Sequence, residues 1–522
     1  MSPGRRLRHA CAVLGLATAL SIGAGGVFPA SAAGPEGVVR GAGSPNAVPG
    51  SYLVVLKEQA GAGGSLRSAA QALARSYGGT VRRTYDAALH GFAADLSARQ
   101  ARRLAADPSV ALVSQNRRVR ADDTQPDPES WGLDRIDHRR LPLDRRYDYP
   151  ATAGRGVTAY IVDTGVRVTQ EEFEGRASNG FDAIDGDNVA QDEHGHGTHV
   201  AGTVAGSTFG AAKAASIVAV RVLDDSGYGT TEQVVAGIDW VTGHAVKPAV
   251  VNLSLGGEPD EVLDAAVRNS IASGLTYAVA AGNDGTDASQ HSPARVPTAL
   301  TVGATDQDDV RASFSNYGPL VDLFAPGVDI VSALSWVDVG GIGTTMSGTS
   351  MATPHVTAAA ALHLAAHPAA TPAQVAAALT AAATTGSVQD AGPGSPDRLL
   401  YTGTAPVRAP GPLFTNGTDV AVDGTVESAI TVTGVPGHAP ADLDVRLAIK
   451  HGWRGDLTID LIAPDGTAYR LRDEDIADGR PDLTALYGVD ASARTANGVW
   501  KLRATDRYGY FPGFIDSWSL RF

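Results

Sequence analysis

Between residues 131 and 401 the chain repeats one pattern that few folds can accommodate. Short runs that are almost entirely apolar alternate with longer stretches of helical character. Strands that are apolar at every position are buried on both faces, which is typical of a parallel sheet covered by helices on both sides. We therefore predict an α/β domain whose strands lie at Val157–Val162, Ile217–Leu223, Ala249–Leu255, Leu275–Ala280, Ala299–Val302 and Val321–Phe324, and whose helices include Thr231–Ala245, Asp260–Ser273 and Ser350–His367.

Three chemically capable side chains stand where strands end or helices begin in this region. Asp163 follows a buried strand, His196 lies in a glycine-spaced turn into a helix, and Ser350 opens an Ala-rich helix. Active sites of open α/β sheets lie outside the carboxyl ends of the strands. Residues on different strand-to-helix turns of one sheet can therefore meet in space.

A hydroxyl is a weak nucleophile at neutral pH unless a base lies within hydrogen-bond reach, and that base needs a carboxylate to fix its tautomer. Ser350, His196 and Asp163 supply these three groups. The start of a helix at Ser350 adds free N–H groups and the positive end of a helix dipole for developing negative charge. Taken singly, each residue has a structural interpretation as a cap or turn residue, and His194, His199 and His355 are expected to be structural.

The segments around the three residues resemble the Asp, His and Ser signatures of the subtilisin family of serine proteases, in that chain order. The resemblance is to the proteinase K branch, and it covers about residues 125–403. Further matching segments are Val222–Thr230, Asn252–Gly257, Ala280–Asn283 and Phe314–Gly318.

The resemblance implies a role for each catalytic residue. Asp163 would orient the base, His196 would be the base and Ser350 the nucleophile. The side chain of Asn283 and the backbone N–H of Ser350 would form the oxyanion hole.

The resemblance also implies how a substrate binds. An extended peptide would lie between two strand edges, and small walls at the floor of the primary pocket predict a broad preference for apolar or aromatic side chains. The edges would be Gly227, Tyr228, Gly229 and Ser254, Leu255, Gly256, and the floor Ala280 and Gly282.

A structural calcium ion is a further expectation. The proteinase K pattern implies the backbone carbonyls of Pro297 and Ala299 together with the carboxylate of Asp322, and oxygen ligands suit calcium. In the last domain, Asp456, Asp506 and Asp516 are either calcium ligands or acids of turns and surfaces.

The start of the chain has the pattern of an export signal. Three arginines precede an apolar run, and small residues follow near Ala30–Ala33. We predict a signal peptide at 1–33 and a secreted, extracellular protein without a membrane segment after signal removal. The alternative is a membrane anchor.

The next segment, predicted as 34–124, contains a small α+β unit at 51–120 that resembles the inhibitor-type propeptide of the family. The propeptide would act as an intramolecular inhibitor. Residues 121–130 read as an exposed processing linker, with the cut near Ala121–Thr124. The catalytic domain is predicted at 125–403.

A Pro/Gly-rich linker is predicted at 404–412, before a third domain at 413–522. Alternating apolar and polar residues separated by turns predict a β-sandwich there. Segments such as Arg454–Thr467, Asn497–Trp500 and Ile515–Leu520 resemble the P domain of proprotein convertases. The resemblance implies a stabilising or substrate-recruiting role, and a plain spacer is the alternative.

Charge and cysteine usage exclude other classes. The chain carries a net charge of −14, and since residues 1–124 contribute +8, the remainder carries −22. A protein with this much negative charge binds nucleic acid poorly, because phosphate contacts require a basic surface. The only cysteine, Cys11, lies in the predicted signal, which excludes cysteine catalysis in the mature protein.

The sequence thus predicts an autoprocessed serine endopeptidase that acts on proteins or peptides as a monomer. Two alternatives concern function. A basic-residue-specific protease of convertase type is suggested by Arg117–Arg120 and the P domain, with Glu258 and Asp260 as nearby acids, although Ala280 and Gly282 are not acidic walls. A non-catalytic binding protein would lack part of the machinery, and none is missing.

Overall fold

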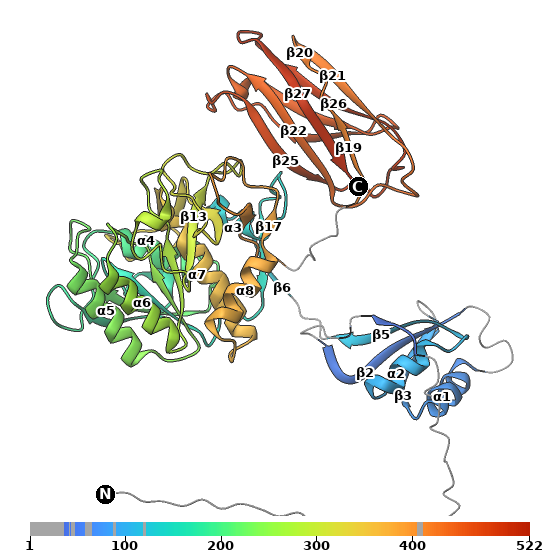
Figure 1. The fold of residues 1–522 in the computed structure, drawn as a ribbon, viewed down its shortest axis with the longest axis horizontal. Coiled ribbons are helices and arrows are strands. Elements are labelled where there is room, and N and C mark those ends of the chain that lie inside the picture. The colour runs from blue at the N-terminus through green and yellow to red at the C-terminus, as the bar shows by residue number, and fades with distance from the viewer. Residues whose placement is uncertain are drawn as a thin grey trace, which may run out of the picture. The chain divides into compact units, whose positions relative to one another are not determined.

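The computed structural model describes residues 36–40, 42, 47–57, 65–86, 90–117, 122–403 and 411–522. The predicted signal peptide therefore lies outside the described residues. By its contacts the chain divides into two compact units, Met1–Val119 and Arg120–Phe522, which are treated separately below (Figure 1).

The first unit is a five-stranded sheet, in the order β1-β5-β2-β4-β3, with two helices packed on it. Both helices begin at a serine whose hydroxyl accepts a backbone N–H, Ser65 and Ser97, as expected for N-caps. The small α+β unit agrees with the sequence analysis, except that the strands β1 and β3 and the first residues of β2 were not predicted. The elements are β1 (Val39–Arg40), β2 (Ala47–Leu56), α1 (Leu66–Ser76), β3 (Thr80–Tyr85), β4 (Gly91–Asp95), α2 (Ala98–Ala105) and β5 (Val110–Arg117).

The centre of the second unit is a nine-stranded sheet in the order β17-β18-β14-β13-β12-β11-β8-β10-β9, and the pairs from β9 to β18 are parallel. The six predicted apolar runs all form strands of it. Its strands are β8 (Thr158–Asp163), β9 (Ala177–Asp182), β10 (Ser216–Arg221), β11 (Ala249–Leu253), β12 (Thr276–Ala280), β13 (Leu300–Thr305), β14 (Leu323–Pro326), β17 (Thr384–Thr385) and β18 (Arg398–Leu399).

Each central strand is buried on both faces, which explains why its sequence does not alternate. In β8, Ile161 belongs to a core shared with α4 and α7, whereas Val162 belongs to a second core shared with α5 and α6. This is the fold class predicted, a parallel sheet with helices on both faces (Figure 1). The helices are α3 (Trp131–Ile136), α4 (His196–Ala205), α5 (Thr231–His244), α6 (Glu261–Ala272), α7 (Thr349–Ala366) and α8 (Pro372–Ala382), with short 3-10 turns at Glu171–Phe173 and Ala288–Gln290.

Two small antiparallel pairs complete the catalytic domain. The hairpin of β15 (Ile330–Ala333) and β16 (Gly343–Met346) leads into α7, and β6 (Asp122–Pro126) pairs with β7 (Arg146–Pro150). The second pair differs from the sequence analysis, which treated residues 121–130 as an exposed linker. Because β6 gains backbone hydrogen bonds from β7, the second folded unit begins before the predicted boundary at 124/125.

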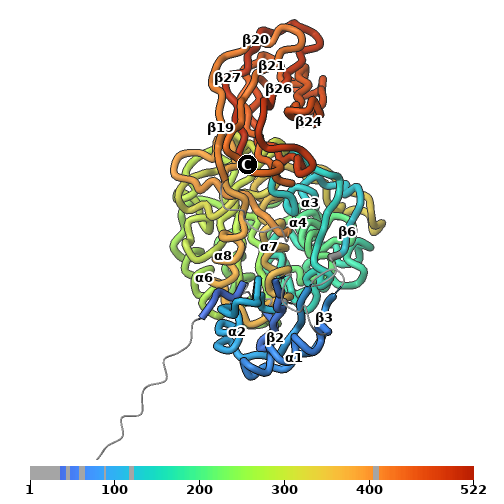
Figure 2. Tube along the Cα trace, turned by 90° about the vertical axis from the view of Figure 1, so that its right-hand side faces the viewer, coloured from blue at the N-terminus to red at the C-terminus, as the bar shows by residue number. Residues whose placement is uncertain are grey.

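The C-terminal residues form two antiparallel sheets around one core, the β-sandwich that the alternating pattern predicted. They gather in one red-orange body in Figure 2. The strands are β19 (Leu413–Asn416), β20 (Val420–Val422), β21 (Thr425–Val432), β22 (Leu443–His451), β23 (Leu457–Ile462), β24 (Ala468–Arg472), β25 (Leu483–Val489), β26 (Gly498–Asp506) and β27 (Gly513–Arg521), with a 3-10 turn at Arg454–Asp456.

The sandwich is joined to the catalytic domain by apolar and hydrogen-bonded contacts. Leu141, from the catalytic domain, is buried in the core of the sandwich. Its carbonyl accepts a hydrogen bond from the Gly488 N–H (2.6 Å), and Arg140 donates from Nε and Nη2 to the two carboxylate oxygens of Asp444 (2.8 and 3.4 Å).

Buried ion pairs also cross this boundary. The Asp308 carboxylate of the catalytic domain accepts hydrogen bonds from Arg454 (2.5 Å) and Arg480 (2.7 Å) of the sandwich. Arg480 also reaches Asp306 (2.5 Å), and Asp478 binds Arg454 and Arg480 from the sandwich side. Since the Asp308 side chain is only 10% exposed and Arg454 only 4%, removal of the Asp308 charge would leave the buried Arg454 guanidinium with Asp478 as its remaining carboxylate partner.

None of the helices in the described part of the chain combines the length and apolar composition that a bilayer-spanning helix requires.

The ion-pair network generates a prediction about stability. Asp308→Asn should lower the free energy of unfolding by about 3 kcal/mol, because it breaks a buried charge pair and removes one of the two carboxylates that balance the Arg454 guanidinium. Denaturant unfolding of protein inactivated with a serine-directed phosphonate measures this without self-digestion. The matched control is Glu427→Gln, which removes a surface carboxylate paired with Lys501 and Arg503 and should cost less than about 1 kcal/mol. Equal losses in the two variants would contradict the prediction.

Candidate active site

Asp163 and His196 meet at the carboxyl end of the sheet. The His196 Nδ1 atom lies 2.6 Å from Asp163 Oδ1, and the same oxygen accepts the Thr164 N–H at 2.7 Å. Asp163 is fully buried, whereas the side chain of His196 is 20% exposed and lines the cleft. Burial alone would lower the pKa of His196, but the charge and hydrogen bond of Asp163 outweigh it and raise the pKa above 6.5.

Asp192 holds these two residues in place, a role that the sequence analysis missed. One carboxylate oxygen accepts the N–H groups of His194 (3.0 Å) and Gly195 (2.8 Å) and the hydroxyl of Thr164 (2.9 Å). The other accepts the Thr198 N–H in the first turn of α4. Because Asp192 is buried, it fixes the turn before His196 and the residue after Asp163 together. Nothing in the local sequence distinguishes it from a surface acid.

Ser350 is the second residue of α7, and its hydroxyl rests against the neighbouring strand edge. Ser350 Oγ donates to the Ser254 carbonyl at 3.1 Å, and Ser254 Oγ donates in return to the Ser350 carbonyl at 2.8 Å. The buried side chain of Asn252 donates to Ser254 Oγ (2.9 Å). Among the hydrogen bonds of the described residues, none joins Ser350 to His196. The predicted hydrogen bond between Ser350 and His196 therefore requires rotation of the Ser350 side chain about its Cα–Cβ bond. Catalytic hydrogen bonds of this kind are often long or unformed before substrate binds.

Asn283 lies directly after β12, next to the turn that carries Ser350. Its Oδ1 accepts the N–H (2.8 Å) and the hydroxyl (2.9 Å) of Thr349, which leaves its Nδ2 facing the other way. A methyl group built on Gly348 would lie 3.6 Å from both Asn283 Nδ2 and the Ser350 backbone nitrogen. The two donors thus converge on one small region, as an oxyanion site requires.

The loop that carries Asn283 is braced from behind by Asn316, another residue whose role the sequence did not reveal. The buried Asn316 donates from Nδ2 to the Ala281 carbonyl (2.9 Å), and its Oδ1 accepts the N–H groups of Asp284 (3.1 Å) and Thr286 (2.9 Å). Gly282 adopts φ +102°, which favours glycine, and an added side chain there would strike the Asn316 amide. Asn316 therefore fixes both Gly282 and the loop that carries Asn283.

Two adjoining cavities lie along this edge. One, of about 400 Å³, is lined by Ala280, Gly282, Asn283 and Ser350, and the other, of about 670 Å³, by His196 and both predicted strand edges, Gly227, Tyr228, Gly229 and Ser254, Leu255, Gly256. The structure thus brings the predicted substrate residues to the same cleft as the predicted catalytic residues.

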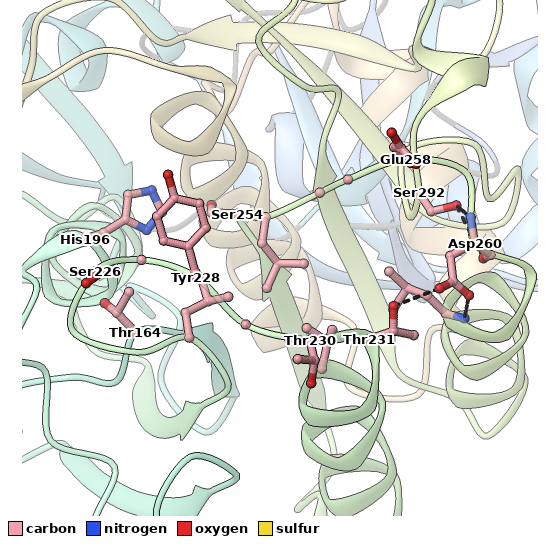
Figure 3. Close-up of a pocket in the computed structure, with 18 of the residues that line it drawn as sticks. Thr164, His196, Ser226, Tyr228, Thr230, Thr231, Ser254, Glu258, Asp260 and Ser292 are labelled. Carbon is pink, nitrogen blue, oxygen red and sulfur yellow. Dashed lines mark hydrogen bonds between the residues drawn. The ribbon is translucent and has the colours of Figure 1, made fainter.

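The acids near the larger cavity are occupied by other contacts. Asp260 is the N-cap of α6, accepting the N–H groups of Val262 and Leu263 and the hydroxyl of Thr231 (Figure 3). These hydrogen bonds hold the pKa of Asp260 below its usual range. Tyr228, 76% exposed, stands over the cleft in the same view. Asp260 is therefore a capping residue, whereas Glu258 remains at the rim.

The other histidines of the motifs differ in position. His199 and His355 are buried, and burial lowers the pKa of each to about 4, so both are neutral. His199 Nε2 lies within hydrogen-bond distance of the carbonyls of Ile330 (3.0 Å) and Thr344 (3.1 Å), linking α4 to the β15–β16 hairpin. His194 lines the cleft beside His196 and was expected to be structural.

The predicted calcium ligands lie at one turn. Asp322 Oδ2 accepts the Thr301 N–H (2.8 Å), which brings the carboxylate beside the segment containing Pro297 and Ala299. Burial raises the pKa of Asp322 to about 6, so a bound cation would favour its ionised form.

A second group, which the sequence analysis did not identify, is formed by Asp134, Asp137 and His138, whose ligand atoms lie within 4.8 Å of one another. The two carboxylates raise the pKa of His138 to about 10, although its burial opposes this. The His138 imidazolium thus balances the negative charge of Asp134 and Asp137, which a bound cation could also balance.

Comparisons with known proteins agree with this geometry. Residues 154–402 match the family described as the subtilase family, residues 440–522 the proprotein convertase P-domain, and residues 51–122 the peptidase inhibitor I9. The exact domain boundaries remain predictions.

Relatives of known name match over most of their length. An extracellular serine proteinase of Thermus sp. (strain Rt41A) is 49% identical over 391 residues, which cover 72% of this chain and 94% of the relative. Alkaline serine exoprotease A of Vibrio alginolyticus is 42% identical over 402 residues, covering 74% and 72%. The crystal structure of a cold adapted subtilisin-like serine proteinase is 50% identical with a TM-score of 0.51, covering 53% of this chain and 98% of that one. The chain therefore belongs to the subtilase family of serine endopeptidases, and it carries an I9-type unit before the catalytic domain and a P domain after it.

Proposed function

We propose that this secreted enzyme hydrolyses peptide bonds of proteins through an acyl-enzyme at Ser350, with His196 as the base and Asp163 as its orienting carboxylate. The observation that carries the proposal is the 2.6 Å contact between Asp163 and His196 at the mouth of a cleft that also holds Ser350 and Asn283. The extracellular relative and the expected signal peptide support secretion.

The resting contacts define how the first step begins. Ser350 Oγ is hydrogen-bonded to the Ser254 carbonyl, and rotation of its side chain would release it toward His196. His196 takes the hydroxyl proton as Oγ attacks the scissile carbonyl. The imidazolium that forms is stabilised by Asp163, and the carbonyl oxygen, now negative, is held by Asn283 Nδ2 and the Ser350 N–H. His196 then returns the proton to the departing amine.

We infer a preference for apolar or aromatic residues before the scissile bond. Ala280 and Gly282 line the smaller cavity without charge, and Asp284 at its rim lies 3.6 Å from His291 Nδ1. The basic-specific alternative is not favoured, because Asp260 caps a helix and Asp284 lies against His291, which leaves the exposed Glu258 as the one remaining acid among the described residues that line the smaller cavity. Cleavage profiling over a peptide library separates the two preferences.

The I9-type unit supports synthesis as an inactive precursor. A folded inhibitor domain preceding the catalytic domain is suited to inhibit the enzyme until it is removed. We propose that the enzyme cuts its own chain before β6, since this strand is paired within the catalytic unit.

The proposed function is tested with Ser350→Ala. Wild-type protein should hydrolyse casein, react with a serine-directed phosphonate and shorten from its 53.5 kDa precursor. The variant should do none of these, because it lacks the nucleophile. Thr353→Ser, a conservative change three residues along α7, serves as the control and should keep all three properties. Wild-type protein that is neither active nor labelled would refute the proposal.

The raised pKa of His196 predicts how activity varies with pH. Only the neutral imidazole can act as a base, so kcat/KM should fall as the pH drops through a value above 6.5. Asp163→Asn removes the negative charge that stabilises the imidazolium. The acid limb should then move to lower pH, and kcat should drop by about 10⁴, as for the equivalent change in another triad protease. An unmoved limb would show that Asp163 does not set this pKa.

We further propose that calcium binds at Asp322 with the carbonyls of Pro297 and Ala299. When bound, it would neutralise a half-buried carboxylate and tie β14 to the turn before β13. Chelation with EDTA should lower the thermal midpoint of wild-type protein, since a ligand that binds only the folded state stabilises it. Asp322→Asn should abolish most of the difference, whereas Asp473→Asn, which changes a 76% exposed carboxylate of the sandwich, should keep it. A midpoint insensitive to EDTA would exclude the site.

A further inference from the structure

We propose that the loop between β15 and β16 forms an apolar surface that binds the leaving-group side of polypeptide substrates. The proposal rests on the proposed function and specifies the class of substrate it favours. The surface, termed here the Trp336 loop, consists of residues 334–342 and presents Trp336, Val339 and Ile342.

The loop exposes more apolar surface than a hairpin connection requires. Trp336 is 62% exposed, Val339 50% and Ile342 47%. Single exposed apolar residues are ordinary on protein surfaces, but three large ones gathered on the one short loop from 334 to 342 favour a contact role.

The backbone of the loop is held firmly in spite of this exposure. Arg167 donates to both carboxylate oxygens of Asp338 (2.5 and 3.2 Å) and to the Ser335 carbonyl (2.8 Å). Gln170 donates to the carbonyls of Leu334 (3.1 Å) and Val337 (3.0 Å).

A second set of contacts fixes the far end of the loop. The Glu171 N–H donates to the Asp338 carbonyl (2.9 Å), and the carboxylates of Glu171 and Glu172 accept the N–H groups of Gly340 (3.2 Å) and Gly341 (2.8 Å). The backbone polar groups of the loop therefore bind residues 167–172, while the side chains of Trp336, Val339 and Ile342 remain exposed. A preordered surface of this kind loses little conformational entropy on binding.

The loop adjoins both catalytic elements. A side chain built on Gly195, the residue before His196, would lie 3.1 Å from Ser335 Oγ and 3.5 Å from the Trp336 ring. At its other end β16 leads through Ser347 and Gly348 to Ser350. Trp336 is thus next to the turn that presents the base.

The chemistry of the reaction decides which part of the substrate reaches this surface. The residues before the scissile bond are expected in the two cavities, and none of Trp336, Val339 and Ile342 lines either of them. His196 must give its proton to the departing amine, so the segment after the scissile bond lies against His196. The departing segment would then continue past Gly195 onto Trp336, which lies beside it.

The partner is therefore a polypeptide with apolar residues just after the bond that is cut. The one charged residue of the loop, Asp338, is already paired with Arg167 and so offers little to a charged substrate. Burial of the three apolar side chains by matching residues of the substrate supplies the attraction.

The test compares substrates that share one sequence before the scissile bond. Two fluorogenic peptides carry Leu-Val-Leu or Ser-Gly-Ser after the bond, and a p-nitroanilide carries no residue there. Wild-type enzyme should favour the apolar peptide by about tenfold in kcat/KM, within the range that a few methylene contacts give. The triple variant Trp336→Ser, Val339→Ser, Ile342→Ser should lose this preference and keep p-nitroanilide hydrolysis within about twofold, since it alters no catalytic contact.

The matched control is the double variant Val246→Ser, Val499→Ser, whose residues are 68% and 45% exposed and line neither cavity. It should keep the preference. A wild-type enzyme without preference, or a triple variant that retains it, would overturn the inference. Absence of p-nitroanilide hydrolysis in wild type would instead overturn the proposed function, so the two failures are distinguishable.

Discussion

The fully buried carboxylate of Asp163 is the constraint around which the catalytic domain is organised. A charge without solvent is costly unless opposite charge and hydrogen-bond donors surround it. One oxygen receives the Thr164 N–H and the His196 ring, while Oδ2 has no partner among the described residues. The same carboxylate that costs stability therefore raises the basicity of His196. Asp192 keeps this arrangement through its hydrogen bonds to the turns on both sides. The Asp163–His196 pair is therefore held by these surrounding hydrogen bonds and not by its own attraction alone.

The elements that carry the remaining groups are tied to one another under the cleft. Asn252, Ser254 and Ser350 form a chain of hydrogen bonds from β11 to α7, and Asn316 connects the segment after β13 to the loop after β12. These contacts hold Ser350, the strand edge at Ser254 and the loop that carries Asn283 at fixed separations. Preorganised donors of this kind stabilise developing charge without having to move during the reaction. The Trp336 loop is attached to the same framework through residues 167–172.

The P domain is in direct contact with the catalytic domain. Leu141 of the catalytic domain completes its core, and Asp306 and Asp308 receive arginines from it. These acids lie in the turn after β13. Buried pairs of this kind add little net stability relative to an apolar contact, but each is costly to break. The joint is therefore sensitive to single changes at its charges.

Much of this protein follows from its sequence alone, because the signals involved are local. Strands buried on both faces, such as Thr158–Asp163, are apolar at nearly every position, so the sequence alone identifies them as central strands. Glycine-spaced turns indicate where the helices of His196 and Ser350 begin. The six apolar runs, the sandwich and the residues gathered at the cleft could thus be predicted. Tertiary structure decided what depends on distant partners. It paired the polar residues 122–126 with β7, buried Asp192 and Asn316 as supports, made Asp260 a helix cap, turned Ser350 toward Ser254, and brought Trp336 beside Gly195. Most of these outcomes have no local signal, because the deciding partner lies far away in the chain and only folding brings the two together. The cap at Asp260 is the exception, since its backbone partners Val262 and Leu263 lie two and three residues away.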